Sequence, residues 1–113
     1  MHLGDREAEL TAYIDTGATF CIFERGYAEL LGLEVEAGTR QEFRTASGRF
    51  TAFGHELTLS TLGIDVDATV YFFADAEIRK NVLGRRGWLD RLRLAIVDYE
   101  QVVYLAHYDN PSN

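Results

Sequence analysis

Apolar and polar positions alternate along much of the chain, a pattern that is typical of strands with one buried face. In residues 7–14 the even positions are apolar, and residues 64–73 show the same alternation most cleanly. Shorter runs of similar character predict further strands at 19–23, 33–35, 41–45, 50–53, 57–59, 94–97 and 102–105. Many short strands of this kind indicate a mainly β fold.

Helical spacing appears in two short segments. Residues 24–31 carry their apolar side chains on one side and precede Gly32, which suits the C-terminal cap of a helix. Residues 86–93 show similar spacing and predict a second short helix. The apolar sides consist of Tyr27, Leu30 and Leu31 in the first segment and of Trp88, Leu89 and Leu92 in the second.

Glycines mark the turns between the strands. Residues 45–49, Thr-Ala-Ser-Gly-Arg, predict the tip of a hairpin, because Gly48 can adopt the positive φ that a tight turn needs. Residues 4–6 and 61–63 predict two further turns. The strands, turns and short helices together predict a β-barrel that is closed or folded over.

Length and composition narrow the class of protein. With 113 residues the chain has the size of one domain, and we expect residues 1–113 to form it, with a polar tail at 107–113. Its net charge of −7 repels phosphate, so neither a nucleic acid nor a membrane surface is an expected partner. The single cysteine, the absence of a long apolar run and a start without a leader predict a cytoplasmic protein.

Three other groups of residues invite a chemical role, and each has a simpler explanation. Cys21 lies in an apolar run with no histidine nearby in sequence, so we expect a buried thiol and not a nucleophile. Asp65 and Asp67 share the solvent face of a predicted strand. The histidines lack the spacing of metal ligands, so we expect neither a metal nor a cofactor. They are His2, His55 and His107.

The segment Asp15-Thr16-Gly17-Ala18 is different, because a core does not need it. An apolar strand delivers a carboxylate to its end, and Gly17 follows two residues later. The strand fixes where the carboxylate points, and the glycine permits a tight turn and a close approach of a ligand to the backbone. A plain turn, in which Asp15 and Thr16 cap their own backbone, is the alternative.

Over residues 7–105 the sequence resembles the retropepsin-like aspartic proteases. The resemblance rests on Asp15-Thr16-Gly17-Ala18 after an apolar strand and on Val82-Leu83-Gly84 before the second predicted helix. It implies hydrolysis of peptide bonds in a peptide or protein substrate, with Asp15 as the catalytic residue. The further implied roles are an active-site loop of Thr16, Gly17 and Ala18, a loop support and subsite of Val82, Leu83 and Gly84, and a flap tip of Ala46, Ser47 and Gly48.

One aspartate cannot run this reaction alone. One carboxylate must be ionised to take a proton from water while a second stays protonated to polarise the scissile carbonyl. Asp15 is the only aspartate of the chain that is followed by Thr-Gly or Ser-Gly. The second carboxylate must therefore come from another chain, which predicts a two-fold homodimer in which two Asp15 side chains meet.

The sequence also departs from the viral members of the family that it resembles. Thr19 stands where those members place an acidic residue, so a pairing of that acid with an arginine such as Arg85 cannot form. The hairpin tip has one glycine where viral flaps are rich in glycine, and little chain precedes residue 4 to build a terminal dimer interface. Either the 94–105 region holds the dimer, or the chain is part of something longer. A retropepsin-like domain for dimerisation or peptide binding, with little or no catalysis, remains the alternative function.

Overall fold

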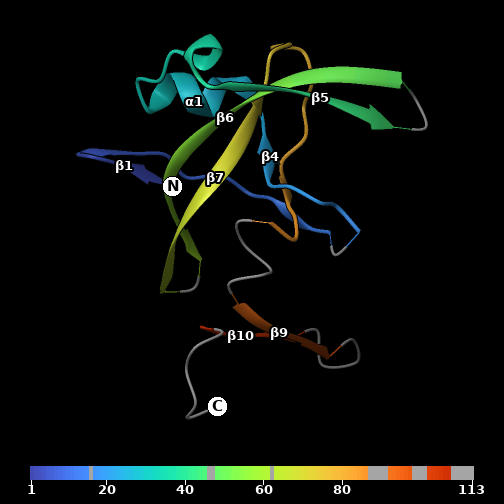
Figure 1. Cartoon of the computed structure of the whole chain (residues 1–113). Coiled ribbons are helices and arrows are strands. Elements are labelled where there is room, and N and C mark those ends of the chain that lie inside the picture. Colours follow the sequence, from blue (N-terminus) through green and yellow to red (C-terminus); the bar gives the residue numbers. More distant parts are fainter. Residues whose placement is uncertain (16, 46–47, 62, 87–91, 98–101, 108–113) are drawn as a thin grey trace.

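The structure of the protein is a computed structural model that describes residues 1–15, 17–45, 48–61, 63–86, 92–97 and 102–107 (Figure 1). Its strands are β1 (His2–Leu3), β2 (Arg6–Glu7), β3 (Tyr13–Ile14), β4 (Ile22–Phe23), β5 (Thr39–Thr45), β6 (Gly48–Thr61), β7 (Ile64–Phe73), β8 (Val82–Leu83), β9 (Leu92–Val97) and β10 (Val102–His107). Its helices are α1 (Arg25–Leu30) and the 3-10 helix η1 (Val35–Ala37). The predicted mainly β class is confirmed.

The long strand β6 is the spine of the larger sheet. It pairs antiparallel with β5 along its first half and with β7 along most of its length, on opposite edges. The strand order continues from β7 through β4 and β8 to β3, while β1 and β2 extend the other edge of β6. No pairing among the described residues joins β2 to β3, so the sheet is not closed and the predicted barrel is not confirmed.

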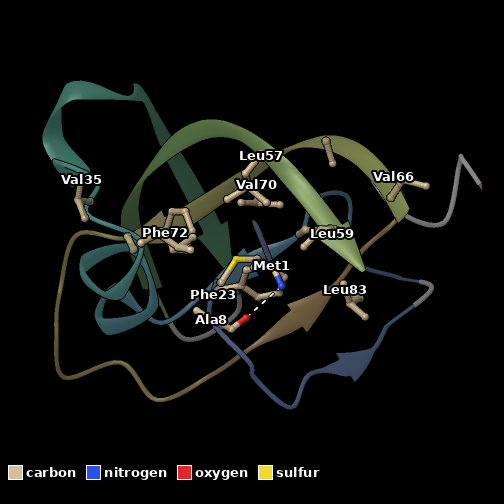
Figure 2. Close-up of a cluster of buried hydrophobic side chains, with 14 residues drawn as sticks. Met1, Ala8, Phe23, Val35, Leu57, Leu59, Val66, Val70, Phe72 and Leu83 are labelled. Atoms are coloured by element: carbon tan, nitrogen blue, oxygen red, sulfur yellow. Dashed lines mark hydrogen bonds between the residues drawn. The ribbon is translucent and has the colours of Figure 1, made fainter. Parts of the chain in front are cut away.

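The core confirms the alternation that the sequence shows. On β7 the side chains of Val66, Ala68 and Val70 are buried, and the residues between them are exposed. Phe23 of β4 and Phe72 of β7 are fully buried and meet edge to face, with ring centroids 6.2 Å apart. Figure 2 shows side chains from several elements converging on this interior. Burial of one such side chain contributes about 1.5–3 kcal/mol, so the interior anchors the short strand β4 to the long sheet.

Residues 1–14 form a hairpin and then a segment with little pairing. The chain turns between β1 and β2 at Gly4, whose φ is +59°, as predicted for residues 4–6. Met1 and Ala8 exchange two backbone hydrogen bonds of 3.0 Å at the edge of the core (Figure 2). The even positions of 7–14 are more buried than the odd ones, as predicted, but strand structure is limited to Glu7, which ends β2, and to β3. The predicted strand is interrupted because β8 offers only two residues to pair with.

Helix α1 confirms the helix predicted at 24–31, and Gly32 after it has a φ of +76°. Ala28 is the buried residue of the helix and Leu31, its C-terminal cap, is buried as well, whereas Leu30 is 62% exposed, so the predicted apolar side is wrong at Leu30. Positions three apart share a helix side because a turn takes about 3.6 residues. Among the described residues no helix has the length and apolarity that crossing a membrane requires.

The strand predicted at 33–35 does not form, and the 3-10 helix η1 starts at Val35 instead. The N–H of Gly38 donates to the carbonyl of Val35 over 3.1 Å, which closes this short turn. Local bonds of this kind satisfy the backbone groups that a strand would have paired with a neighbour. Val35 is still buried, so the alternation correctly indicates an inward side chain but not the element that carries it.

The helix predicted at 86–93 is wrong at both of its ends. Arg86 forms a parallel bridge with Phe20, and Leu92 and Arg93 belong to β9. Their backbone groups pair in a ladder with β10, which a helix would not allow. The central residues of this prediction, 87–91, lie outside the described residues.

Strands β9 and β10 confirm the strands predicted at 94–97 and 102–105. They pair antiparallel in a two-stranded sheet of their own, and no pairing among the described residues joins this sheet to the larger one. β10 extends through His107, so the predicted polar tail is wrong at its first residue. The rest of that tail, 108–113, and the connection 98–101 lie outside the described residues.

Candidate active site

Three short strands position the Asp15 loop, by which we mean residues 15–21. β3 leads into the loop, β4 follows it, and β8 lies between these two strands in the sheet. Asp15 emerges directly from the end of β3, and its backbone N–H donates to the carbonyl of Leu83 over 3.0 Å. This bond fixes the point from which the carboxylate leaves the backbone.

The chain that follows β8 holds the far side of the same loop. Two backbone N–H groups donate to loop carbonyls, from Arg85 to Ala18 over 2.9 Å and from Arg86 to Thr19 over 2.8 Å. A Cβ on Gly84 would lie only 2.2 Å from the carbonyl oxygen of Phe20, so only glycine fits there. Val82, Leu83 and Gly84 thus lie directly against the Asp15 loop.

Cys21, at the end of the loop, is fully buried, as predicted for a thiol in an apolar run. The N–H of Gly84 donates to its Sγ over 3.4 Å. The Sγ in turn lies 3.9 Å from the carbonyl oxygen of Gly84 and 3.7 Å from that of Arg86. The sequence indicates the burial of Cys21 but not this contact with the support of the loop, because the partners are more than 60 positions away.

The Asp15 carboxylate is held on one side and open on the other. Its Oδ1 accepts a hydrogen bond from the Gly17 N–H over 2.9 Å, and the Asp15 carbonyl accepts one from Ala18 over 3.1 Å. Within the described residues no other hydrogen bond reaches this carboxylate, and the residue is exposed. One oxygen is therefore oriented by the loop while the carboxylate stays accessible to a reactant.

An open cleft of about 620 Å³ lies between the Asp15 loop and the β5–β6 hairpin. It brings together Asp15, Gly17, Ala18, Val82 and Gly48, all predicted from the sequence. Leu83 and Gly84 do not line the cleft. Thr16, Ala46 and Ser47 lie outside the described residues. The other residues that line the cleft are Thr19, Phe20, Ile22, Phe43, Arg44, Arg49, Phe50, Phe73, Ile78 and Lys80.

The β5–β6 hairpin confirms the one predicted at 41–53, and it reaches out from the rest of the sheet (Figure 1). Aromatic rings connect it to the loop side of the cleft. Phe43 and Phe50 face each other across the hairpin and stack 5.1 Å apart. Phe43 also meets Phe20 at 5.4 Å, and Phe50 meets Phe73 at 5.1 Å. We call these rings, together with Tyr71, the aromatic cluster. Sequence reasoning missed the cluster because only Phe20 lies near the Asp15 motif in the sequence.

Asn81 is a second residue that sequence reasoning missed, and it is only 7% exposed. Its side-chain carbonyl accepts from the Glu24 N–H over 2.9 Å, and its amide donates to the Thr11 carbonyl and to the Glu24 carboxylate over 3.1 Å each. Its backbone carbonyl accepts from the Tyr13 N–H over 2.9 Å. Asn81 thereby joins the start of β8 to the chain before β3 and to the start of α1. Its one signal in the sequence is a polar residue directly before the apolar pair Val82-Leu83.

The site thus combines an aspartate loop, a parallel strand β8 that supports it and a hairpin on the other side of the cleft. A comparison with known families identifies the class of protein that has this combination. Residues 3–86 match the family model described as Aspartyl protease. The match spans most of the chain, so the protein belongs to this retropepsin-like aspartyl protease family. A search of curated proteins finds no match. The family match ends at Arg86, so β9 and β10 lie beyond it.

Proposed function

We propose that the protein is an aspartic endopeptidase that acts as a homodimer, with the two Asp15 carboxylates as its catalytic dyad. Membership of the aspartyl protease family supports protease activity on peptide or protein substrates. The observation that carries the proposal is the placement of an exposed Asp15 carboxylate in the cleft, on a loop whose backbone is bonded to β8 and the residues after it. A capping turn alone needs neither that support nor the cleft.

The reaction divides the work between two carboxyl groups. One Asp15 carboxylate takes a proton from a water molecule, and the oxygen of that water attacks the scissile carbonyl carbon. The other Asp15, which is protonated, donates its proton to the carbonyl oxygen. The tetrahedral intermediate then collapses, the C–N bond breaks, and the leaving nitrogen receives a proton from the dyad. Two carboxylates held close share one proton because both cannot be ionised at once.

The chain's own groups take supporting roles in this proposal. The Gly17 N–H orients one oxygen of Asp15, and the Gly17 backbone contacts the bound peptide. The family resemblance implies two further roles, a hydrogen bond of Thr16 across the dimer axis and packing of the active-site loop by Ala18. The β5–β6 hairpin, for which the sequence predicts Ala46, Ser47 and Gly48 as the tip, closes over an extended peptide and excludes water.

The β9–β10 sheet is our candidate for the element that holds the dimer together. An isolated two-stranded hairpin is marginally stable at best in water. This one pairs with no other strand among the described residues, and its register sets Leu94 opposite Leu105 and Ile96 opposite Val103. A second copy of the same sheet would supply the missing surface and bring the two Asp15 loops under one axis.

A single substitution tests the proposal. Asp15→Asn removes acid and base together from the dyad that the two chains share, while keeping nearly the same shape. We expect peptidase activity to fall by at least about a hundredfold, with the fold and the dimer mass in sedimentation unchanged. The wild-type rate should follow a bell-shaped pH profile with an acidic optimum, because only the singly protonated dyad is active.

The matched control is Asp5→Asn, which removes an exposed carboxylate at the turn between β1 and β2 and should leave activity intact. A strict monomer at high concentration would overturn the dimer. A folded Asp15→Asn protein that cleaves at the wild-type rate would remove Asp15 from the mechanism. If the wild type binds peptides and hydrolyses none, the alternative function of a peptide-binding or dimerisation domain takes its place.

A further inference from the structure

The cleft beside Asp15 differs in charge from the chain as a whole. The chain has a net charge of −7. Among the described residues, the cleft lining holds Arg44, Arg49 and Lys80, which we call the cationic rim, and Asp15 as the one acidic residue. The rim is thus a local excess of positive charge on an acidic protein, at the place where a substrate would enter.

The cationic rim has no counterion among the described residues. Arg40, on the same strand as Arg44, is paired with Glu42 at 3.0 Å. The other ion pairs between described residues also leave out all three rim residues. The rim charges are therefore accessible to a ligand without first breaking a salt bridge in this part of the chain.

The register of the hairpin makes this arrangement costly. Arg44 stands directly opposite Arg49, one position nearer the tip than the Phe43–Phe50 pair. Like charges in directly opposed positions of an antiparallel pair repel each other and destabilise the hairpin. An anion placed near both guanidinium groups would relieve that repulsion, and guanidinium groups bind carboxylates with good geometry.

We propose that the cleft selects acidic peptides, whose carboxylate side chains bind the cationic rim. The inference rests on the proposed function and names its substrate class. The rim residues come from two separate segments, the β5–β6 hairpin and the chain before β8, so more than one acidic side chain can be bound at once. The rim also offsets the repulsion that an acidic substrate meets from the rest of this acidic chain.

Three fluorogenic peptides test the proposal with the intact protein. They share a central Phe-Leu pair and differ only in the flanking residues, which are glutamate, glutamine or lysine on both sides. We expect kcat/KM to be at least about fivefold higher for the glutamate peptide than for the glutamine peptide, and lowest for the lysine peptide. Because the rim is exposed, added salt should reduce the preference. Equal kcat/KM for all three peptides would overturn the proposal.

Charge-neutral variants assign the preference to the rim. Arg44→Gln, Arg49→Gln and Lys80→Gln should each reduce the ratio of glutamate to glutamine peptide, and the double variant Arg44→Glu/Arg49→Glu should reverse it. Arg40→Gln is the matched control, since it removes one arginine of the same hairpin from outside the cleft, and it should keep the wild-type ratio. A preference that survives in the rim variants, or that disappears in the control, would contradict the assignment. Thermal melting of each variant checks that it is folded.

A binding measurement separates this inference from the proposed function. The same three peptides are titrated into Asp15→Asn and followed by fluorescence anisotropy. Suppose the wild type cleaves no peptide, but Asp15→Asn binds the glutamate peptide at least about fivefold more tightly than the glutamine peptide. The protease proposal then fails and the acidic selectivity stands. If the peptides are cleaved without regard to charge, the protease proposal stands and the selectivity fails.

Discussion

The two walls of the cleft are built by different kinds of interaction. The Asp15 loop is held by backbone hydrogen bonds from β8 and the residues after it, and by a contact so close that Gly84 admits no side chain. The β5–β6 hairpin is held at its base by β7, and in its outer half Phe43 and Phe50 pack against the other rings of the aromatic cluster.

The difference matches the two tasks of the proposed reaction. Backbone hydrogen bonds and steric contacts have narrow geometric limits, which suits a loop that must present a carboxylate in one position. Contacts between rings are non-directional by comparison and can slide or part at small cost. A hairpin held in this way can open to admit a peptide and close again without disturbing the loop.

The strongest way to break this contrast is to add one methyl group to the loop support. Gly84→Ala would set a Cβ 2.2 Å from the Phe20 carbonyl oxygen. The Gly84 and Phe20 backbones lie in segments joined by hydrogen bonds, so neither can move away from the other alone. We expect the free energy of unfolding to fall by about 3 kcal/mol, measured by urea denaturation.

Gly26→Ala is the matched control for that substitution. A Cβ at Gly26, in α1, meets no atom within 4 Å, so it should leave stability unchanged or raise it by up to about 1 kcal/mol. Equal stability of the two variants would mean that the loop support is not as tight as the structure has it.

A somewhat smaller loss is expected at Asn81. Asn81→Ala leaves the Glu24 N–H and the Thr11 carbonyl without their side-chain partner. An unsatisfied buried polar group costs about 1–3 kcal/mol, so unfolding should become easier by about 2 kcal/mol. Glu77→Ala, an exposed position in the same connection, serves as the control. A loss at Glu77 as large as that at Asn81 would show that the whole connection is fragile and that the amide has no special part.

On the hairpin side, Phe43→Ala should change mobility more than stability. Its ring contacts Phe20, Phe50 and Tyr71 at centroid distances of 5.4, 5.1 and 5.5 Å. We expect a stability loss of about 1 kcal/mol, together with faster amide hydrogen exchange in β5 and the first half of β6. The amide protons of Arg85 and Arg86, which report on the Asp15 loop, should exchange at unchanged rates.

In the wild type the hairpin should already exchange faster than β7 and slow down when a peptide-like inhibitor is bound. For the Phe43→Ala variant, Gln41→Ala at an exposed position of β5 is the control for the loss of side-chain volume. Hairpin amides that exchange as slowly as those of β7 would contradict a mobile hairpin.

The features that sequence reasoning predicted are those with a local cause. The alternation in 64–73 and the turn glycines act over a few residues, and they correctly place β7, the β5–β6 hairpin and the β1–β2 turn. The Asp15 motif was found because its residues are contiguous. Periodicity alone could not tell that Val35 enters the core from a 3-10 helix, because burial of one residue does not define the element that carries it.

The features that were missed depend on partners far apart in the sequence. Asn81 bonds to residues 57 and 70 positions away, and Cys21 lies against Gly84, 63 positions away. The aromatic cluster likewise joins rings from the Asp15 loop, the hairpin and β7. A single sequence carries no signal for such contacts, because the residue types in them are common and their meeting depends on the fold.

The smallest predicted effect lies away from the cleft, in the ion pair that joins α1 to η1. Both Nη atoms of Arg25 donate to Glu36, over 2.6 and 2.8 Å, and this hydrogen bonding holds the pKa of Glu36 below its ordinary value of 4.5. A lowered folded-state pKa stabilises the fold above the unfolded value, and the contribution is lost as pH falls from 4.5 through the folded value. Glu36→Gln should therefore flatten the acid limb of the stability curve slightly, measured by urea denaturation at stepped pH. Among the described residues the hydrogen bonds of Arg25 and Glu36 reach each other and the Ala74 carbonyl, but neither the Asp15 loop nor the hairpin, so hydrogen exchange in both walls of the cleft at neutral pH should stay at wild-type rates. Faster exchange in the hairpin alone would instead show that α1 and η1, and not the aromatic cluster by itself, hold the β5–β6 hairpin in place.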